Sequence, residues 1–181
     1  MSGVLIRPAV VCLFMLSACA TLSEPECVHG DWEQIGYRDG QNGRPLARID
    51  EHRDACLRYG VSPALPAYSA GRERGLNFYC TPANGVVVGR RGEHYAGVCP
   101  AASEERFLRG YEAGRAVHYA RERMDHVERA RRDAEMRMVE APTREQAQYW
   151  NLRLLRLDME RDFIWMDLRR LETRAAEHGR Y

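Results

Sequence analysis

The chain has 181 residues, with 27 arginines, 26 acidic side chains and a formal net charge of +1. This balance excludes the strongly basic surface with which proteins bind nucleic acids or anionic membranes. The length suits one modest domain, or a small domain together with an extended element.

Residues 1–18 are typical of a lipoprotein signal peptide. Arg7 precedes an apolar run, Val10 to Leu16, that is too short to span a bilayer. The run leads into Leu16-Ser17-Ala18-Cys19, which matches the bacterial lipobox, so we expect cleavage before Cys19 and lipidation of its thiol. An ordinary signal peptide with a coincidental cysteine is the alternative. Removal of residues 1–18 takes Arg7 with it and leaves a formal net charge of 0.

The residue after Cys19 predicts the destination. Two or three acyl chains hold a protein stably on a membrane. Where envelopes sort lipoproteins by this position, Asp retains them at the inner membrane, and here the position holds Ala20. We therefore expect a lipid anchor in the outer membrane, facing the periplasm, with residues 19–26 as a lipidated linker.

Four further cysteines, Cys27, Cys56, Cys80 and Cys99, remain after loss of Cys12 and lipidation of Cys19. An even number of cysteines in an oxidising compartment favours two disulfides. Of the three connectivities we favour Cys27–Cys56 with Cys80–Cys99, because each closes one local loop. A zinc site is the alternative, but no C-x-x-C pair occurs and we expect no metal.

The cysteine-containing part, which we bound at residues 27–118, holds a recurrent Tyr-x-x-Gly unit. It occurs at Tyr37, Tyr68 and Tyr111, each followed three residues later by glycine. On helices such residues form a ridge and a notch that allow close backbone approach. We favour three short helices packed through these notches over glycine turns.

Two further elements are expected in this part. Residues 49–59 are predicted as a helix that ends at Gly60. In residues 84–95 β-branched residues are followed by turn residues and then by an aromatic residue, so the segment is predicted as two short strands about Arg90-Arg91-Gly92. The Cys80–Cys99 disulfide would close the base of this β-hairpin.

Residues 113–178 are predicted as a long antiparallel helical hairpin resembling a coiled coil, with its turn near 139–143. Two heptad stripes, from Ala113 to Met138 and from Trp150 to Ala175, flank Pro142 and a Thr143/Gln146 capping box. Antiparallel pairing places small residues of the first stripe opposite large ones of the second. The fold class is therefore mainly α: a small disulfide-stapled domain of short helices with one β-hairpin, followed by this hairpin.

The second hairpin helix carries a further line of apolar residues. They are Leu152, Leu155, Met159, Phe163 and Met166. Two apolar faces need more cover than one helix provides. We weigh packing on the stapled domain, or a wider hairpin core, against a surface for self-association or for a partner.

Enzyme motifs do not occur in the sequence, and we expect no catalytic residue and no cofactor. Asp31, Asp39, Arg48, His52, Arg72 and Arg90 could line a polar pocket, but ion pairing and helix capping are favoured. For Asp31 we expect an N-cap, and for His52 burial beside the disulfide of Cys56. A possible ligand surface in the stapled domain comprises Trp32, Tyr37, Tyr68 and Arg72.

The sequence resembles a known family through a set of motifs in residues 27–118. They include Asp31-Trp32, Gly36-Tyr37-Arg38-Asp39-Gly40, His52 with Cys56, Tyr68 with Gly71-Arg72, Tyr79-Cys80-Thr81-Pro82, Gly97-Val98-Cys99-Pro100 and Phe107 with Gly110-Tyr111 and Gly114. These are similar to the bacterial lipoprotein family catalogued as domain of unknown function 2799. The resemblance implies a cell-envelope lipoprotein without an assigned activity, so no catalytic residue is transferred.

We therefore expect an envelope scaffolding or protein-interaction lipoprotein, whose partner is an envelope protein or peptidoglycan. The alternative is a periplasmic binding module for a small polar ligand or a peptidoglycan fragment.

Overall fold

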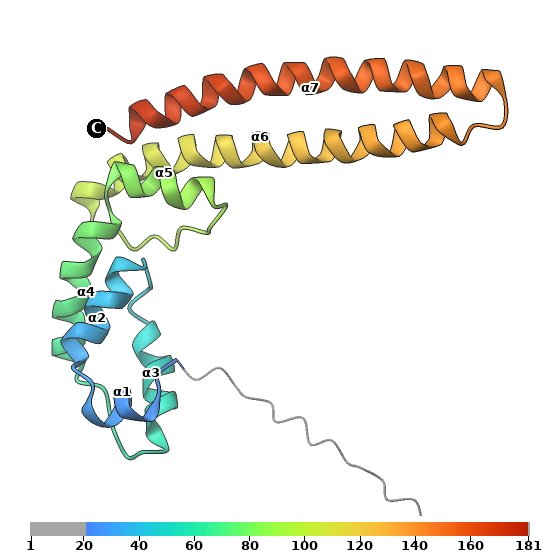
Figure 1. Cartoon of the computed structure of the whole chain (residues 1–181). Coiled ribbons are helices and arrows are strands. Elements are labelled where there is room, and N and C mark those ends of the chain that lie inside the picture. The colour runs from blue at the N-terminus through green and yellow to red at the C-terminus, as the bar shows by residue number, and fades with distance from the viewer. Residues whose placement is uncertain (1–20, 181) are drawn as a thin grey trace, which may run out of the picture.

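A computed structural model describes residues 21–180, and every regular element in this part of the chain is an α-helix. The predicted signal peptide and Cys19 lie outside the described residues. The helices are α1 (Glu24–His29), α2 (Trp32–Gln41), α3 (Arg48–Leu57), α4 (Leu65–Tyr79), α5 (Pro82–Arg90), α6 (Ala101–Val139) and α7 (Arg144–His178). Figure 1 shows an L-shaped molecule, in which α1 to α4 form one arm, α6 and α7 form the other, and α5 lies at the corner.

The first arm is held by a crossing of α2 and α4 at glycines. Gly36 and Gly40 of α2 meet Gly71 and Gly75 of α4, and a Cβ on any of the four would lie less than 3.0 Å from a carbonyl oxygen of the other helix. Real Cβ atoms essentially never come so close, so only glycine allows this backbone contact. The Tyr-x-x-Gly units of α2 and α4 are thus helical and pack on each other, as predicted. The third unit, at Tyr111, is helical too, but it lies in the 39-residue α6 rather than in a short helix.

The same crossing recurs between α5 and α6. Gly85 and Gly89 of α5 meet Gly110 and Gly114 of α6. As in the first crossing, each glycine contacts a backbone carbonyl of the other helix, and that carbonyl belongs to the residue three positions before one of the partner glycines. Three residues after the second glycine of α2 and of α5 comes a glycine with positive φ, Gly43 at 64° and Gly92 at 69°. The stapled domain therefore contains the same glycine crossing of two helices twice.

The prediction of a β-hairpin at residues 84–95 is wrong. Residues 82–90 form α5, and residues 91–100 are a loop without strands. Thr81 caps α5 by accepting the backbone N–H of Asn84 at 3.2 Å, and Pro82 begins the helix. The β-branched residues Val86 to Val88 suggested a strand, but backbone contact with α6 overrides this weak local preference.

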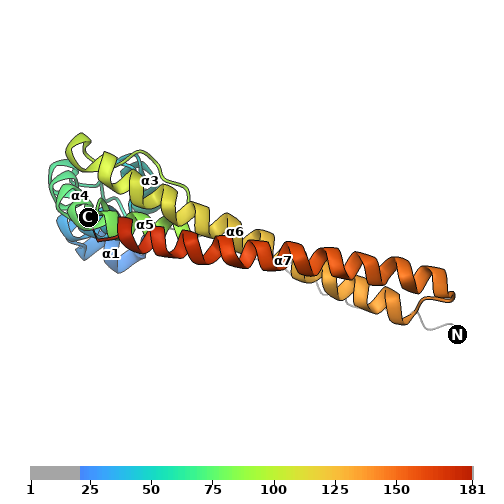
Figure 2. The same cartoon turned by 90° about the horizontal axis from the view of Figure 1, so that it is seen from above.

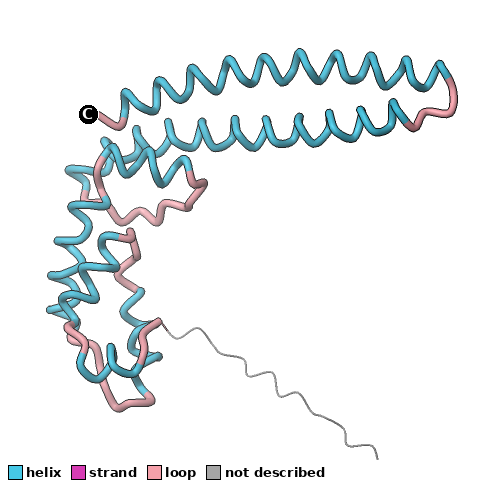
Figure 3. The backbone as a smooth tube through the Cα atoms, viewed as in Figure 1, coloured by secondary structure: helices cyan, strands magenta, loops and turns pink. Residues whose placement is uncertain are grey.

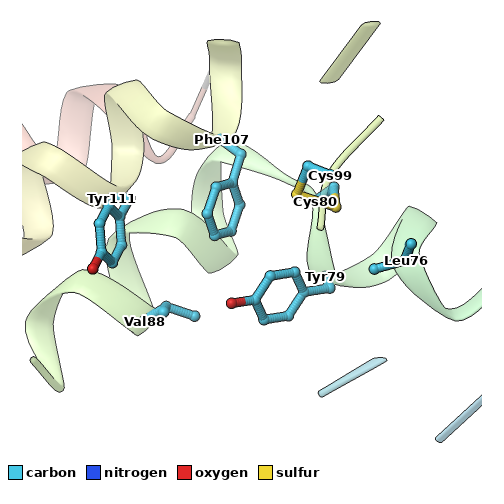
Figure 4. Packing of buried hydrophobic residues seen from close by; sticks show 7 residues of the cluster. All are labelled: Leu76, Tyr79, Cys80, Val88, Cys99, Phe107 and Tyr111. Atoms are coloured by element: carbon cyan, nitrogen blue, oxygen red, sulfur yellow. A yellow bond between two sulfur atoms is a disulfide. The ribbon is translucent and has the colours of Figure 1, made fainter. Parts of the chain in front are cut away.

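The two disulfides have the predicted connectivity. Cys27–Cys56 joins α1 to α3, and Cys80–Cys99 joins the C-cap of α4 to the loop before α6, with Cα atoms 5.3 and 5.5 Å apart. Figure 4 shows the second disulfide beside the stacked rings of Tyr79 and Phe107, whose centroids lie 5.1 Å apart. The disulfides therefore lie inside the two small cores rather than on the surface.

Helices α6 and α7 form the predicted antiparallel hairpin, seen from above in Figure 2. The turn is short, and Thr143 caps α7 by accepting the backbone N–H of Gln146 at 3.3 Å. The core alternates small residues of α6 with large ones of α7, as Ala134 and Leu154 illustrate. Figure 3 shows α6 passing without a break from the corner into the hairpin, so the two parts share this helix.

Candidate interaction surface

The five residues of the predicted partner face lie in solvent on α7. Leu152, Leu155, Met159, Phe163 and Met166, here called the α7 stripe, are 53% to 67% exposed. On an ideal helix all five fall within about 40° of Met159, because steps of four and seven residues nearly complete whole turns. The structure therefore places the stripe neither in the hairpin core nor against the stapled domain.

The stripe lies opposite the face of α7 that packs on α6. That buried face comprises Leu154, Leu157 and Ile164, which are 3% to 8% exposed, and their side chains pack against Val127 and Ala134. Helix α7 is thus apolar on two opposite sides, and only one of them is covered. A contiguous exposed apolar line of this kind is typical of an interaction site.

The four residues of the predicted ligand surface do not meet on one surface. Tyr68 is fully buried, and Trp32 packs beside it in the core of the first helix pair. Tyr37 contacts Phe78 edge to face at a centroid distance of 5.9 Å. The Nε of Arg72 donates to the carbonyl of Arg44 at 2.8 Å. Each of these side chains has a packing or hydrogen-bonding role of its own.

A buried polar network joins three of the helices in this part of the chain. Nε2 of His52 lies 2.8 Å from Oδ2 of Asp39, which also accepts the hydroxyl of Tyr68 at 2.7 Å. Burial acts to raise the pKa of Asp39, but the hydrogen bonds from His52 and Tyr68 outweigh it and hold that pKa below its usual value. The carboxylate is thus ionised and accepts only, so Nε2 of His52 carries a proton. Burial, followed by the hydrogen bond to Asp39, raises the pKa of Tyr68 far above its usual value.

The network reaches the first described residue. Nδ1 of His52 lies 2.8 Å from Oγ1 of Thr21, and this hydroxyl also donates to the carbonyl of Glu51 at 3.2 Å. Next along the chain, Leu22 is only 5% exposed and packs in the core with Cys27. The described part of the expected linker is therefore held on the folded body through Thr21 and Leu22. Thr21 was not among the predicted site residues, because a single threonine carries no sequence signal for this contact.

The other polar candidates act in capping and pairing. Asp31 caps α2 by accepting the backbone N–H of Glu33 at 2.9 Å and that of Gln34 at 3.3 Å. Arg48 pairs with Glu51, and Arg90 pairs with Glu172 of α7. Arg48 also lines a small cavity of about 200 Å³ beside the Asp39 network. Within residues 21–180 no group of three or more His, Cys, Asp or Glu side chains is placed to hold a metal ion.

A larger cavity, of about 580 Å³, lies between the loop that follows α2 and the loop that follows α5. Arg44, Tyr79, Arg91, Glu93 and His94 are among its lining residues. Tyr79, which is only 6% exposed overall, lines this cavity. Sequence reasoning missed this cavity because its two walls are loops about fifty residues apart.

Comparison with known proteins gives one match. No curated protein and no solved structure matches the chain. None of the helices within residues 21–180 combines the length and the apolar character needed to cross a bilayer. The one match is to a family model and covers residues 31–116. This segment includes both glycine crossings and ends early in the hairpin, so the α7 stripe lies outside it. Residues 31–116 match the model of the family described as protein of unknown function (DUF2799), so this segment is similar to that family.

Proposed function

We propose that this protein is an envelope lipoprotein, anchored through Cys19 in the outer membrane and facing the periplasm, that acts as a scaffold by binding a protein through the α7 stripe. The observation that carries the proposal is the line of five large apolar side chains left in solvent on α7. Soluble proteins rarely expose such a contiguous line unless it binds something.

The anchor is supported by the lipobox and by the packing of the residues that follow it. Thr21 and Leu22 are already part of the folded body. Because a residue spans at most about 3.6 Å, an acyl chain on Cys19 would hold the stapled domain within about 7 Å of the bilayer surface. Such a domain would be a base fixed at the membrane rather than a body on a long tether.

The scaffold role is supported by the shape and stiffness of the hairpin. The 35 residues of α7 extend about 50 Å at 1.5 Å per residue. Ion pairs between the helices, such as Arg131–Asp158 at 2.6 Å and Arg123–Asp167 at 2.8 Å, add to the apolar core along the hairpin. An arm of this kind presents the stripe well away from the anchored end (Figure 1).

Membrane fractionation tests the anchor. The wild-type protein and a Cys12→Ala control, altered only in the predicted signal peptide, are expected in the outer-membrane fraction. Cys19→Ala is expected to leave this fraction. A Cys19→Ala variant that stays in the outer membrane would overturn the anchor.

Crosslinking in intact cells tests the interaction surface. A photoreactive residue at position 163 of the stripe is expected to give discrete protein adducts, which Met159→Asp in the same chain removes. The same residue at Met136, an exposed position of α6, is the matched control. Equal adduct patterns from both positions would contradict a role for the stripe.

Binding of a small polar ligand is the second candidate function, and the cavity of about 580 Å³ favours it. Its lining is rich in hydrogen-bond donors from Arg44, Arg91 and Tyr79, a composition that suits a ligand with acceptor groups. Titration of the full chain with a soluble peptidoglycan fragment tests this function. Saturable binding that Tyr79→Phe weakens is expected, and no binding at millimolar ligand would remove this candidate.

A further inference from the structure

The α7 stripe has a symmetry that identifies a partner. Its positions are centred on Met159, since Leu152 and Met166 lie seven residues to either side and Leu155 and Phe163 lie four to either side. Two copies of α7 packed antiparallel about a two-fold axis at Met159 would place Leu152 against Met166 and Leu155 against Phe163. Every apolar residue of the stripe then meets an apolar residue of the second copy.

Charges beside the stripe favour the same arrangement. On an ideal helix Glu145, Arg156, Glu160 and Arg174 all lie on one flank of the stripe. None of the four has an ion-pair partner within residues 21–180, whereas Asp158, Asp167 and Glu172, nearer to α6, are all paired. An antiparallel pair brings Arg156 near Glu160 of the second copy and Glu145 near Arg174 of the second copy, each contact occurring twice.

Residues at the ends of the stripe disfavour the parallel alternative. Gln148 and Arg170 lie eleven residues to either side of Met159, close to the centre line of the stripe. A parallel pair in register would oppose Arg170 to Arg170 of the second copy, which is repulsive. An antiparallel pair opposes Arg170 to Gln148 of the second copy, which offers a carbonyl acceptor.

From this complementarity we infer that the α7 stripe binds a second copy of this chain, as an antiparallel homodimer centred on Met159. The inference rests on the proposed function only in treating the stripe as an interaction surface, and it does not depend on the lipid. The contact runs from Glu145 to Arg174, about 44 Å of helix. A two-fold axis normal to a membrane brings the N-terminal ends of both copies to the same side, so the dimer is compatible with acyl anchors in one membrane.

Disulfide crosslinking of the purified full-length protein tests the geometry. Met159→Cys is expected to form a covalent dimer on mild oxidation, because equivalent side chains meet on the axis. Leu152→Cys alone is expected to stay monomeric, since its equivalents lie about 21 Å apart, but to crosslink when mixed with Met166→Cys. Val139→Cys, at an exposed position near the end of α6, is the control. A dimer from Leu152→Cys alone, or no dimer from Met159→Cys above the Val139→Cys level, would overturn the inference.

A charge exchange provides an independent test. Glu145 and Arg174 are too far apart on one helix to pair within a chain, so a coupling between them can arise only between copies. Glu145→Arg is expected to weaken dimerisation about threefold to tenfold in sedimentation equilibrium. Adding Arg174→Glu is expected to restore most of the affinity. A double variant no tighter than the single variant would contradict the antiparallel pairing, as would a wild-type protein that stays monomeric at high concentration.

The two proposals fail in different ways. A monomeric protein whose position 163 still forms Met159-dependent adducts with another protein would refute the homodimer and leave the interaction surface intact. Loss of both the dimer and the adducts would refute the proposed role of the stripe as well.

Discussion

Nε2 of His52 in α3 donates to Oδ2 of Asp39 in α2 across 2.8 Å, inside the first arm of the molecule. The hydroxyl of Tyr68 in α4 donates to the same oxygen. One carboxylate thus joins three helices at the place where the glycine crossing brings the backbones of α2 and α4 together. Removing this carboxylate would leave two buried donors without an acceptor. The loss in folding free energy is therefore larger than the net contribution of the two hydrogen bonds.

Asp39→Ala is therefore expected to lower the free energy of unfolding by about 3 kcal/mol. Asp39→Asn keeps an acceptor oxygen and is expected to cost about half as much. Tyr68→Phe removes one donor and leaves no orphaned group on α4, so it should cost about 1 kcal/mol. Urea unfolding of the full chain measures all three. An Asp39→Ala variant as stable as the wild type would contradict a structural role for the network.

Acid is expected to destabilise the start of the folded body through Glu26. The backbone N–H and hydroxyl of Ser23, and then Arg38, lower the pKa of Glu26 from 4.5 to about 2. A carboxylate with a depressed folded-state pKa stabilises the fold fully above pH 4.5, and this stabilisation is lost as the pH falls towards 2. The lowered pKa of Asp39 acts in the same direction. Glu26 is partly exposed, so solvent screening keeps its contribution modest.

Urea unfolding at a series of pH values from 6 to 2 checks this expectation. The stability of Glu26→Gln should depend less steeply on pH than that of the wild type below pH 4.5. Glu177→Gln, at an exposed position near the end of α7, is the control and should retain the wild-type slope. Parallel pH profiles for wild type and Glu26→Gln would show that the Ser23 capping contact does not form.

Local sequence signals were sufficient to predict the helices of the hairpin, where these signals are strong. They failed for α5, whose structure depends on contacts between residues far apart in the sequence. The Thr143 cap and the heptads specify the hairpin, because helix start signals and a 3.5-residue period act within a few residues. Gly85 and Gly89 lie beside a β-branched run, in the segment that was predicted as a β-hairpin. Their partners, Gly110 and Gly114, lie about 25 residues away, so only the crossing with α6 explains why α5 is a helix. The features of the candidate site also differ in how far the sequence predicts them. The periodicity identified the stripe as a second apolar face but left open whether it is covered, whereas the Thr21 contact and the loop-lined cavity depend on tertiary structure.

The glycine crossings make a prediction opposite to ordinary helix propensity. Alanine normally stabilises an exposed helix position by about 1 kcal/mol relative to glycine. At Gly40 and Gly85 a Cβ would instead lie less than 3.0 Å from a backbone oxygen of the neighbouring helix. Gly40→Ala and Gly85→Ala are therefore each expected to lower the free energy of unfolding by about 3 kcal/mol or more.

Gly179→Ala is the matched control for these variants. The nearest atom to a Cβ at Gly179 lies at 3.4 Å, an ordinary contact, so little change in stability is expected. Thermal unfolding followed by circular dichroism measures all three variants. A Gly85→Ala variant as stable as the wild type would contradict the packing of α5 on α6.

Each disulfide is expected to stabilise the small core in which it lies. Cys27–Cys56 and Cys80–Cys99 close loops with sequence separations of 29 and 19 residues. On the chain-entropy model loops of this size contribute about 3 to 4 kcal/mol. Replacing either pair by serine should lower the midpoint of urea unfolding, and mass analysis of non-reduced peptides checks the connectivity. Peptides linking Cys27 to Cys80 or Cys99 would contradict the two-core arrangement.

The packing of the hairpin core predicts different losses of stability when a large side chain is truncated and when a small one is enlarged. Ala134 of α6 is almost fully buried against Leu154 of α7, in a core that alternates small and large residues. Leu154→Ala leaves a cavity and is expected to cost about 2 to 5 kcal/mol. Ala134→Leu overpacks the same layer and is expected to cost about 1 to 3 kcal/mol. Met136→Leu, two residues away and exposed, is the control and should change stability little.

If Leu154→Ala and Ala134→Leu are combined, the added leucine fills part of the space that Leu154→Ala empties. The double variant should therefore lose less stability than the sum of the single changes, by about 1 kcal/mol or more in a double-mutant cycle. Strict additivity would mean that these two positions do not face each other, and the register of α6 on α7 would then have to differ.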